Sequence, residues 1–315
     1  MNQQLDISVV VPLYNEEESL PELVAWIDRV AHTNNLSYEI IMVDDGSTDR
    51  SWEVVEELKA KYLTIRGICF MRNYGKSAAL YCGFDMARGE VVFTMDADLQ
   101  DSPDEIPEMR RMILEEGYDI VSGWKRKRHD PISKRWPSKF FNFTARLMSG
   151  IKLHDFNCGL KAYRRKVVKA IEVYGEMHRY IPILAKHAGF KRIGEKAVEH
   201  HERKYGKSKF GLERMLKGYL DLISVSFMSH FGRSPMYLFG GLGTLMFLFG
   251  FGAVVWIIVE KFVASRPLTN QPLFYLSLVS ILLGAMLFLA GFLGELINRR
   301  SVDRNKYLID KQIDE

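Results

Sequence analysis

The chain has 315 residues and a formal net charge of +4, and 47% of its residues are hydrophobic. The length exceeds that of one ordinary domain, and the small positive charge alone identifies no partner. The three cysteines, an odd number without a C-x-x-C pair, argue against a disulfide framework and a zinc site and indicate a reducing compartment. The first residues lack the basic and apolar regions of a signal peptide, so we interpret them as a strand that opens a domain.

Strand-like and helix-like patterns alternate through the first 122 residues. The predicted strands cover residues 7–11, 38–43, 64–70, 90–95 and 119–122. The predicted helices cover residues 17–31, 50–61 and 77–87. This order predicts an α/β domain that has a mostly parallel sheet with helices on both faces. Ligands of such sheets bind beyond the carboxyl ends of the strands, where Asp44-Asp45 and Asp96-Ala97-Asp98 fall.

The stretch 91–105, VVFTMDADLQDSPDE, places several acids directly after an apolar strand pattern. Carboxylates crowded in this way repel one another unless a cation lies among them. Mg²⁺ and Mn²⁺ prefer oxygen ligands, and one or two carboxylates together with substrate phosphates commonly hold such ions. On an extended segment Asp96 and Asp98 would point the same way, and Ala97 would face the core. Gln100 could add a contact. The alternative is a solvated loop whose acids only cap a helix.

A helix start is predicted just after these acids. Ser102 and Glu105 have the spacing of a capping box, and Pro103 falls at the first helical position. The acids would therefore lie in a short loop between the end of a strand and the start of a helix.

Two familiar phosphate-binding loops are excluded. The turn after the first strand reads VPLYNEEES and contains no G-x-G-x-x-G. Gly75-Lys76-Ser77 resembles the end of a P-loop, but the position that needs the earlier glycine is Phe70. A phosphate ligand would therefore need a cation, and a nucleotide-sugar is a ligand of this kind. A metal ion would offset charge on the departing nucleoside diphosphate as a Lewis acid.

Basic and aromatic residues are mixed after the last predicted strand. The basic residues are Lys125, Arg126, Lys127, Arg128, Lys134, Arg135 and Lys139, and the aromatic ones are Trp136, Phe140, Phe141 and Phe143. This mixture is typical of a membrane interface, and residues 210–231 share it. Some of the cations could bind the phosphate of a lipid acceptor; the alternatives are a solvated face and unspecific attraction to anionic lipid. A nucleic-acid ligand is disfavoured because the charge adjoins membrane-seeking segments.

Two long apolar runs follow, at residues 236–259 and 273–297. Each exceeds the roughly 20 residues needed to cross a membrane, which disfavours a buried soluble helix. Lys and Arg flank the outer ends of the two runs, whereas the connecting loop has only Lys261 and Arg266. The positive-inside rule then places the N-terminal domain and residues 299–315 in the cytoplasm. Five glycines on the first run would permit close helix packing: Gly240, Gly241, Gly243, Gly250 and Gly252.

Six stretches together resemble one family: VVVPLYNEEESL, IIMVDDGSTD, RNYGKSAALYCGF, MDADLQDSPDEIP, DFNCGLKAYRR and RKYGKSKFGL. In this order they are similar to the family 2 glycosyltransferases of GT-A fold. Within that family they resemble the polyprenyl-phosphate glycosyltransferases, relatives of dolichol-phosphate mannose synthase and the bactoprenol glucosyltransferases. The two apolar runs match one subgroup. The chain departs from many relatives at residues 157–159, and it lacks the Q-x-x-R-W motif of processive polysaccharide synthases.

The resemblance implies a role for each matching residue. The donor-binding residues would be Pro12, Tyr14, Asn15, Glu16, Asp44, Lys76, Asp96, Tyr205, Lys207 and Lys209. The ligands of a Mg²⁺ or Mn²⁺ ion would be Asp96, Asp98 and Gln100. The acceptor phosphate would contact Arg126, Arg135 and Lys139, and the catalytic residues would be Asp98 and Asp155. Because a phosphate acceptor is already largely ionised, Asp155 could act as a base or only position a substrate.

The sequence therefore predicts a GT-A catalytic domain at 1–207, amphipathic juxtamembrane helices at 208–234, two transmembrane helices at 235–298 and a cytoplasmic tail at 299–315. It predicts inverting transfer of a hexose, with UDP-glucose favoured, to polyprenyl phosphate at the cytoplasmic face of a bacterial inner membrane. The alternatives are transfer to another lipid such as diacylglycerol, and a non-catalytic nucleotide-binding protein tethered to the membrane. The resemblance also implies a homo-oligomer such as a tetramer.

Overall fold

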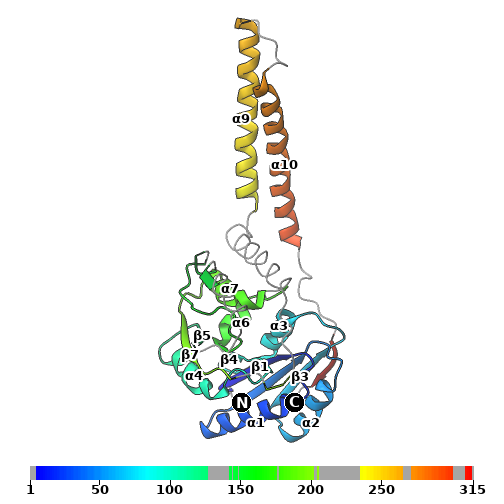
Figure 1. The fold of residues 1–315 in the computed structure, drawn as a ribbon, viewed down its shortest axis with the longest axis vertical. Helices are drawn as coiled ribbons and strands as arrows, with labels where there is room; N and C mark the ends of the chain where they lie inside the picture. Colours follow the sequence, from blue (N-terminus) through cyan, green and yellow to red (C-terminus); the bar gives the residue numbers. More distant parts are fainter. Residues whose placement is uncertain are drawn as a thin grey trace. The chain divides into compact units, whose positions relative to one another are not determined.

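The computed structural model describes residues 5–126, 142–143, 145–147, 149–175, 177–201, 204–205, 235–264, 271–300 and 309–313. The chain divides into two compact units, Met1–Val225 with Asn305–Glu315, and Ser226–Arg304. The first unit contains a sheet with helices on both of its faces, and the second contains two long apolar helices (Figure 1).

A mixed eight-stranded sheet forms the centre of the first unit, in the order β7-β5-β6-β4-β1-β2-β3-β8. Its strands are β1 (Ile7–Leu13), β2 (Tyr38–Asp44), β3 (Ile65–Phe70), β4 (Val91–Thr94), β5 (Ile120–Lys125), β6 (Lys161–Arg164), β7 (Ile193–Val198) and β8 (Ile309–Ile313). The strands β4, β1, β2 and β3 are parallel, and β6 is antiparallel to both β4 and β5. The strands β1 to β5 confirm the predicted ones, whereas β6, β7 and β8 fall outside every predicted range.

Helices cover both faces of the sheet, as predicted, and each face has its own apolar core. One face carries α1 (Leu20–Thr33), α2 (Ser51–Lys61) and α4 (Ile106–Leu114). The other carries α3 (Lys76–Met86), α6 (Arg165–Ala170) and α7 (Ile181–His187), with the short 3-10 turn η2 (Met177–Tyr180). Between these layers β1 and β2 are buried along nearly their whole length, which explains why apolar residues, many of them β-branched, dominate both strands.

The first helix begins later than predicted because the chain turns before entering it. Asn15 has a φ of 56°, in the left-handed region, and its backbone N–H donates to Ser47 Oγ at 2.9 Å. The helix α1 then starts at Leu20, with Pro21 in its first turn, where the missing N–H costs no helical hydrogen bond. The N-E-E-E run therefore forms a loop at the end of β1 instead of a helical turn.

The capping box predicted from Ser102 and Glu105 does not form. Ser102 Oγ accepts the backbone N–H of Asp104 at 3.3 Å, and Pro103 occupies the first helical position, as predicted. The Glu105 carboxylate forms an ion pair with Lys196 of β7 instead of reaching back to Ser102. The cation brought by a distant strand competes for this carboxylate more strongly than a backbone N–H does.

The last described segment returns to the sheet. Residues 309–313, which the sequence analysis assigned to the tail, form β8 and pair antiparallel with β3. Ile313 lies opposite Gly67, and Lys311 lies opposite Cys69. Without β8, the strand β3 would be an edge strand with unpaired backbone groups. The sheet therefore contains chain from both before and after the two apolar helices.

The helices of the second unit pack against each other through glycines. They are α9 (Pro235–Ala264) and α10 (Pro272–Arg300), within which Leu238–Val263 and Pro272–Gly294 are long and apolar enough to cross a membrane. A Cβ on Gly243 would lie 2.6 Å from the carbonyl oxygen of Gly284, so the two backbones touch there. A Cβ on Gly241 or Gly252 would meet nothing within 4 Å. The predicted close packing at the glycines of the first apolar run is therefore confirmed for Gly243 but not for Gly241 and Gly252.

Candidate active site

Three neighbouring strands bring the predicted donor residues to one edge of the sheet. The strand β1 lies between β2 and β4 and is parallel to both. Pro12 lies near the end of β1, Asp44 ends β2, and Asp96 follows closely after β4. Because carboxyl ends of parallel strands meet at one edge, the two acidic segments lie on the same side of the sheet, as predicted.

Hydrogen bonds tie the loop after β1 to the loop after β2. Asn15 Oδ1 accepts the backbone N–H of Thr48 at 2.8 Å, while the Asn15 N–H donates to Ser47 Oγ. The Ser47 N–H in turn donates to Asp44 Oδ1 at 2.9 Å. Asp44 is buried, and burial raises the pKa of its carboxyl group. The predicted donor residues Asn15 and Asp44 therefore belong to one rigid rim.

The second acid of the Asp44-Asp45 pair has a structural task. The Asp45 carboxylate accepts the backbone N–H groups of Tyr74 (2.7 Å) and Gly75 (2.9 Å) at the start of α3. Burial raises the pKa of Asp45 to about 6, and these two hydrogen bonds oppose the rise. Asp45 thereby fixes the end of α3 that presents Lys76 to the site.

Asp96 forms an ion pair with Lys76, the first residue of α3. Burial by itself would raise the pKa of Asp96. The Lys76 ammonium outweighs this effect, and the ammonium groups of Lys125 and Lys161 add to it. The pKa of Asp96 is therefore held at about 2, and the group is a carboxylate at every physiological pH. The resemblance assigned both Asp96 and Lys76 to the donor, and the structure places them in contact.

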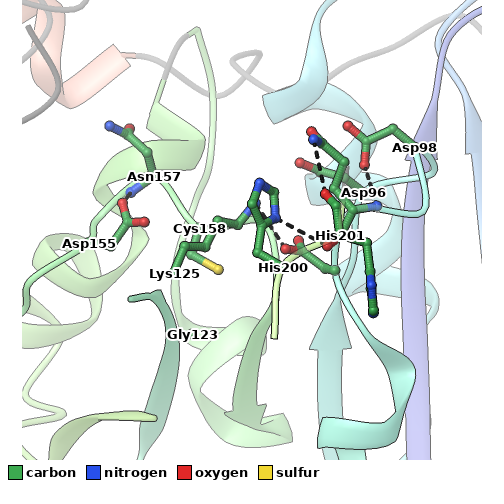
Figure 2. Close-up of polar contacts among 12 residues, drawn as sticks. Asp96, Asp98, Gly123, Lys125, Asp155, Asn157, Cys158, His200 and His201 are labelled. Atoms are coloured by element: carbon green, nitrogen blue, oxygen red, sulfur yellow. Dashed lines mark hydrogen bonds and ion pairs between the residues drawn. The ribbon is translucent and has the colours of Figure 1, made fainter. Parts of the chain in front are cut away.

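The segment from Asp96 to Gln100 is a turn and not an extended strand, so the predicted parallel orientation of Asp96 and Asp98 rested on a wrong geometry. Leu99 has a φ of 60°, and Asp98 Oδ1 accepts the backbone N–H of Gln100 at 3.2 Å (Figure 2). Gln100 contacts the chain beyond β7: its carbonyl oxygen accepts the His201 backbone N–H at 2.9 Å. The assignment of Asp98 and Gln100 as metal ligands stays a prediction.

Asp101 was not a predicted site residue, yet its carboxylate lies beside that of Asp96. Its side chain is fully buried, and Oδ1 lies 2.9 Å from Lys125 Nζ. Oδ2 accepts no hydrogen bond from the residues that the structure describes. A Cβ on Gly159 would lie 2.5 Å from Asp96 Oδ2 and 2.9 Å from Asp101 Oδ2. A side chain at position 159 would therefore push one or both carboxylate ends aside, and a third acid in the D-x-D-x-x-D spacing was the available sequence signal.

The paired carboxylates fit a hard divalent cation. In the described part of the chain, no group of three or more His, Cys, Asp and Glu side chains gathers as metal ligands. Mg²⁺ needs no such group, because one or two carboxylates together with substrate phosphates usually hold it. Asp96 Oδ2 and the unpartnered Asp101 Oδ2 supply two converging oxygens of this kind.

A pocket opens next to Asp96. Its lining residues are Pro12, Lys76, Leu80, Thr94, Asp96, Phe156, Asn157, Cys158, Gly159, Lys161, Tyr163, His178, Arg179 and Ile181. The sequence did not indicate Lys161, His178 and Arg179 as site residues, because their place in the pocket depends on how β6 and η2 fold against Asp96. His178 donates its backbone N–H to Ser77 Oγ at 3.0 Å, and burial lowers the pKa of its ring well below the usual value. The ring is therefore neutral, and the pocket's formal charges come from its lysines, its arginine and Asp96.

Asp155, the predicted catalytic acid, is buried in the loop that forms one wall of this pocket. Its Oδ1 accepts the backbone N–H of Asn157 at 3.0 Å. Figure 2 shows Asp155 and Asn157 together on one segment, and Asp96 and Asp98 on another. This hydrogen bond shapes the turn that carries Asn157 at the pocket, and the catalytic assignment of Asp155 stays a prediction.

The other predicted residues lie at the margins of the site. Tyr14 and Glu16 are half-exposed in the loop after β1. Tyr205 reaches α1, where its hydroxyl donates to Glu22 at 3.5 Å. Arg126 is exposed just beyond the end of β5. The remaining ones lie outside the described residues: Arg135, Lys139, Lys207 and Lys209.

Comparison with known proteins identifies the family. Residues 8–172 match the family described as glycosyl transferase family 2. A dodecaprenyl-phosphate galacturonate synthase from Rhizobium johnstonii is 36% identical over 305 residues, which cover 94% of this chain and 89% of that protein. An undecaprenyl-phosphate 4-deoxy-4-formamido-L-arabinose transferase from Pseudomonas aeruginosa is 35% identical over 313 residues, which cover 98% of this chain and 90% of that protein.

A solved structure supports the fold independently. Glucosyl-3-phosphoglycerate synthase from Mycobacterium tuberculosis, in complex with Mn²⁺, UDP and phosphoglyceric acid, matches with a TM-score of 0.53 at 19% identity, over 71% of this chain and 78% of that chain. At this identity the likeness shows the fold alone. The chain belongs to glycosyl transferase family 2, and it is a glycosyltransferase whose first unit has the GT-A fold.

Proposed function

We propose that this enzyme transfers a sugar from a nucleoside-diphosphate donor to polyprenyl phosphate at a membrane surface. The observation that carries the proposal is the pocket beside Asp96, where the Asp96 carboxylate and the Lys76 ammonium meet at the carboxyl edge of the sheet. The two relatives named above support the lipid acceptor, because both names contain a polyprenyl phosphate. The apolar helices α9 and α10 would keep the enzyme where such a lipid is found.

Each residue near Asp96 has a chemical task in this proposal. Lys76 would leave its ion pair with Asp96 and contact the donor diphosphate as the carboxylate engages a cation. Asp96 and Asp101 would hold Mg²⁺ or Mn²⁺, with Asp98 as a further predicted ligand. When bound, the ion offsets negative charge on the leaving nucleoside diphosphate. Asp44 and Asn15, on the rigid rim, would contact the nucleoside.

The reaction we propose inverts the anomeric carbon. An oxygen of the lipid phosphate forms a bond to this carbon from the face opposite the nucleotide, and the bond between the carbon and the diphosphate oxygen breaks. The acceptor is largely ionised at neutral pH, because the second pKa of a phosphate monoester is about 6. No protein base is therefore needed, which agrees with Asp155 holding the Asn157 turn. We also propose that the catalytic unit faces the cytoplasm.

The sequence and the names of the relatives point to different donor sugars, and an assay can distinguish them. The sequence favours UDP-glucose, whereas the two relatives are named for galacturonate and for 4-deoxy-4-formamido-L-arabinose. The test is to incubate the purified full-length protein with undecaprenyl phosphate, Mn²⁺ and a panel of UDP-sugars that includes these three. We expect release of nucleoside diphosphate and formation of a lipid-linked sugar with one donor. Release only when diacylglycerol replaces polyprenyl phosphate, or no release with any donor, would refute the proposal.

A further inference from the structure

A buried lysine lines the pocket without a carboxylate in ion-pair contact among the residues that the structure describes. Lys161 is the first residue of β6 and is only 4% exposed. Its Nζ donates one hydrogen bond, to the carbonyl oxygen of Cys158, and it forms no ion pair with any of the residues that the structure describes. An ammonium group has three N–H donors, so its capacity for hydrogen bonds is not filled.

Such a group destabilises the folded protein until an anion arrives. Moving an ammonium group from water into a buried site is costly unless a negative group pairs with it. Burial accordingly lowers the pKa of Lys161, and the nearby Lys76 ammonium lowers it further. If this lysine served only to fill space, an apolar side chain of similar length in its place would cause no loss of folding stability. The structure places this amino group at the wall of a pocket.

The surroundings of Lys161 favour an anionic ligand. Arg179 of η2 lines the same pocket, and so does Lys76. The lining contains one carboxylate, that of Asp96, which is already paired with Lys76. Asn157 is exposed at the pocket and can donate a hydrogen bond from its amide without adding charge. The pocket thus offers positive charge and donors beside β6, which β4 and β1 separate from β2 in the sheet.

We propose that Lys161 anchors an oxyanion subsite in this pocket, whose ligand is a charged substrate group other than the donor diphosphate. This inference rests on the proposed function and deepens it. Two substrates could supply the group: the acceptor through its lipid phosphate, or the donor through a carboxylate on its sugar. Both offer oxygens that take charge-assisted hydrogen bonds from an ammonium group.

The test measures binding by calorimetry on the full-length protein in detergent, so that it does not depend on turnover. The probes are farnesyl phosphate against farnesol for the acceptor, and UDP-galacturonate against UDP-galactose for the sugar, with UDP alone as the reference. For each pair we compare the affinity of the charged probe with that of its neutral partner. In Lys161→Met we expect this ratio of affinities to fall by about 10- to 100-fold for one of the two pairs. The affinity for UDP should stay within about twofold. Lys191→Met, which removes an exposed lysine outside the pocket, is the matched control.

Thermal stability separates a ligand-binding lysine from a structural one. We expect the Tm of Lys161→Met to equal or exceed that of the wild type, because the variant removes a buried charge and keeps the length of the side chain. Asn157→Asp gives a second test at an exposed position: its new carboxylate should repel the same charged probe. If the wild type and both variants bind the charged probes with equal affinity, the proposed subsite is wrong but the proposed function stands. A loss of UDP affinity in Lys161→Met would also overturn only the subsite. A wild type that binds none of the probes would overturn the proposed function as well.

Discussion

The convergence of Asp96 and Asp101 over Gly159 leads to a quantitative prediction for Gly159→Ala. The added Cβ would lie 2.5 Å from Asp96 Oδ2, which is about 0.9 Å short of the 3.4 Å at which ordinary contact begins. The backbone cannot retreat freely, because the Gly159 carbonyl oxygen accepts a hydrogen bond from the Thr94 hydroxyl at 2.8 Å. The Asp96 carboxylate must therefore move by most of an ångström.

A shift of this size is large for an active site. Misplacing a catalytic group by about 1 Å costs on the order of 100-fold in rate. We therefore expect kcat/KM for release of nucleoside diphosphate to fall by about 100-fold in Gly159→Ala. The affinity for Mn²⁺, measured by electron paramagnetic resonance of the free ion, should fall by at least about tenfold, since two oxygens of the pair are displaced. The cost in folding stability should be about 1–3 kcal/mol, as for other overpacked sites.

A matched glycine controls for the methyl group itself. A Cβ on Gly241 of α9 meets nothing within 4 Å, so Gly241→Ala should leave activity and Mn²⁺ affinity unchanged. If Gly159→Ala folds and keeps both quantities within about threefold of the wild type, the carboxylate pair does not hold the cation, and the reasoning from the converging oxygens is wrong.

Three further predictions concern individual acids. Asp98→Ala should abolish metal-dependent turnover; activity that survives would leave Asp96 and Asp101 as the ligands. Asp155→Asn should lower kcat by less than about tenfold if the residue only positions the Asn157 turn, and a loss of about 100-fold or more would instead indicate proton transfer. Burial raises the pKa of Asp45 to about 6 from the usual 3.8, so the folded state binds the proton more tightly and the wild type loses stability as pH rises between these values. The Tm of Asp45→Asn minus the Tm of the wild type should therefore increase as the pH rises from 4 to 7. A difference in Tm that does not change with pH would contradict this prediction.

The parts of the fold that sequence patterns predicted are those with strong local signals. The strands β1, β2 and β4 are mostly apolar and buried, and the acids at or just after the ends of β2 and β4 mark the predicted ligand-binding edge. The strands β6 and β7 lack this signal: the first has four residues, and the second is half-exposed with mixed polarity. Their presence in the sheet depends on pairing with distant strands, which no local pattern encodes.

The same distinction applies to the site. Asp96 was found because it lies in a recognisable motif at a strand end. Lys161 and Asp101 were missed because their importance comes from burial, which β6 creates by inserting between β4 and β5. The segment that carries Asp98 was predicted to be extended but is a turn, since the positive φ of Leu99 cannot be inferred from an apolar residue.

The pairing of β8 with β3 changes how the apolar helices relate to the rest of the chain. They are an insertion within the soluble unit and not an anchor appended to it, because the polypeptide leaves the sheet before α9 and rejoins it after α10. If the helices cross a bilayer, the chain must leave from and return to the side that holds the sheet, which requires an even number of passes without reference to flanking charge. Cutting the chain after α10 would therefore remove a strand from the catalytic unit, and a shortened protein should be expected to expose β3 to other molecules.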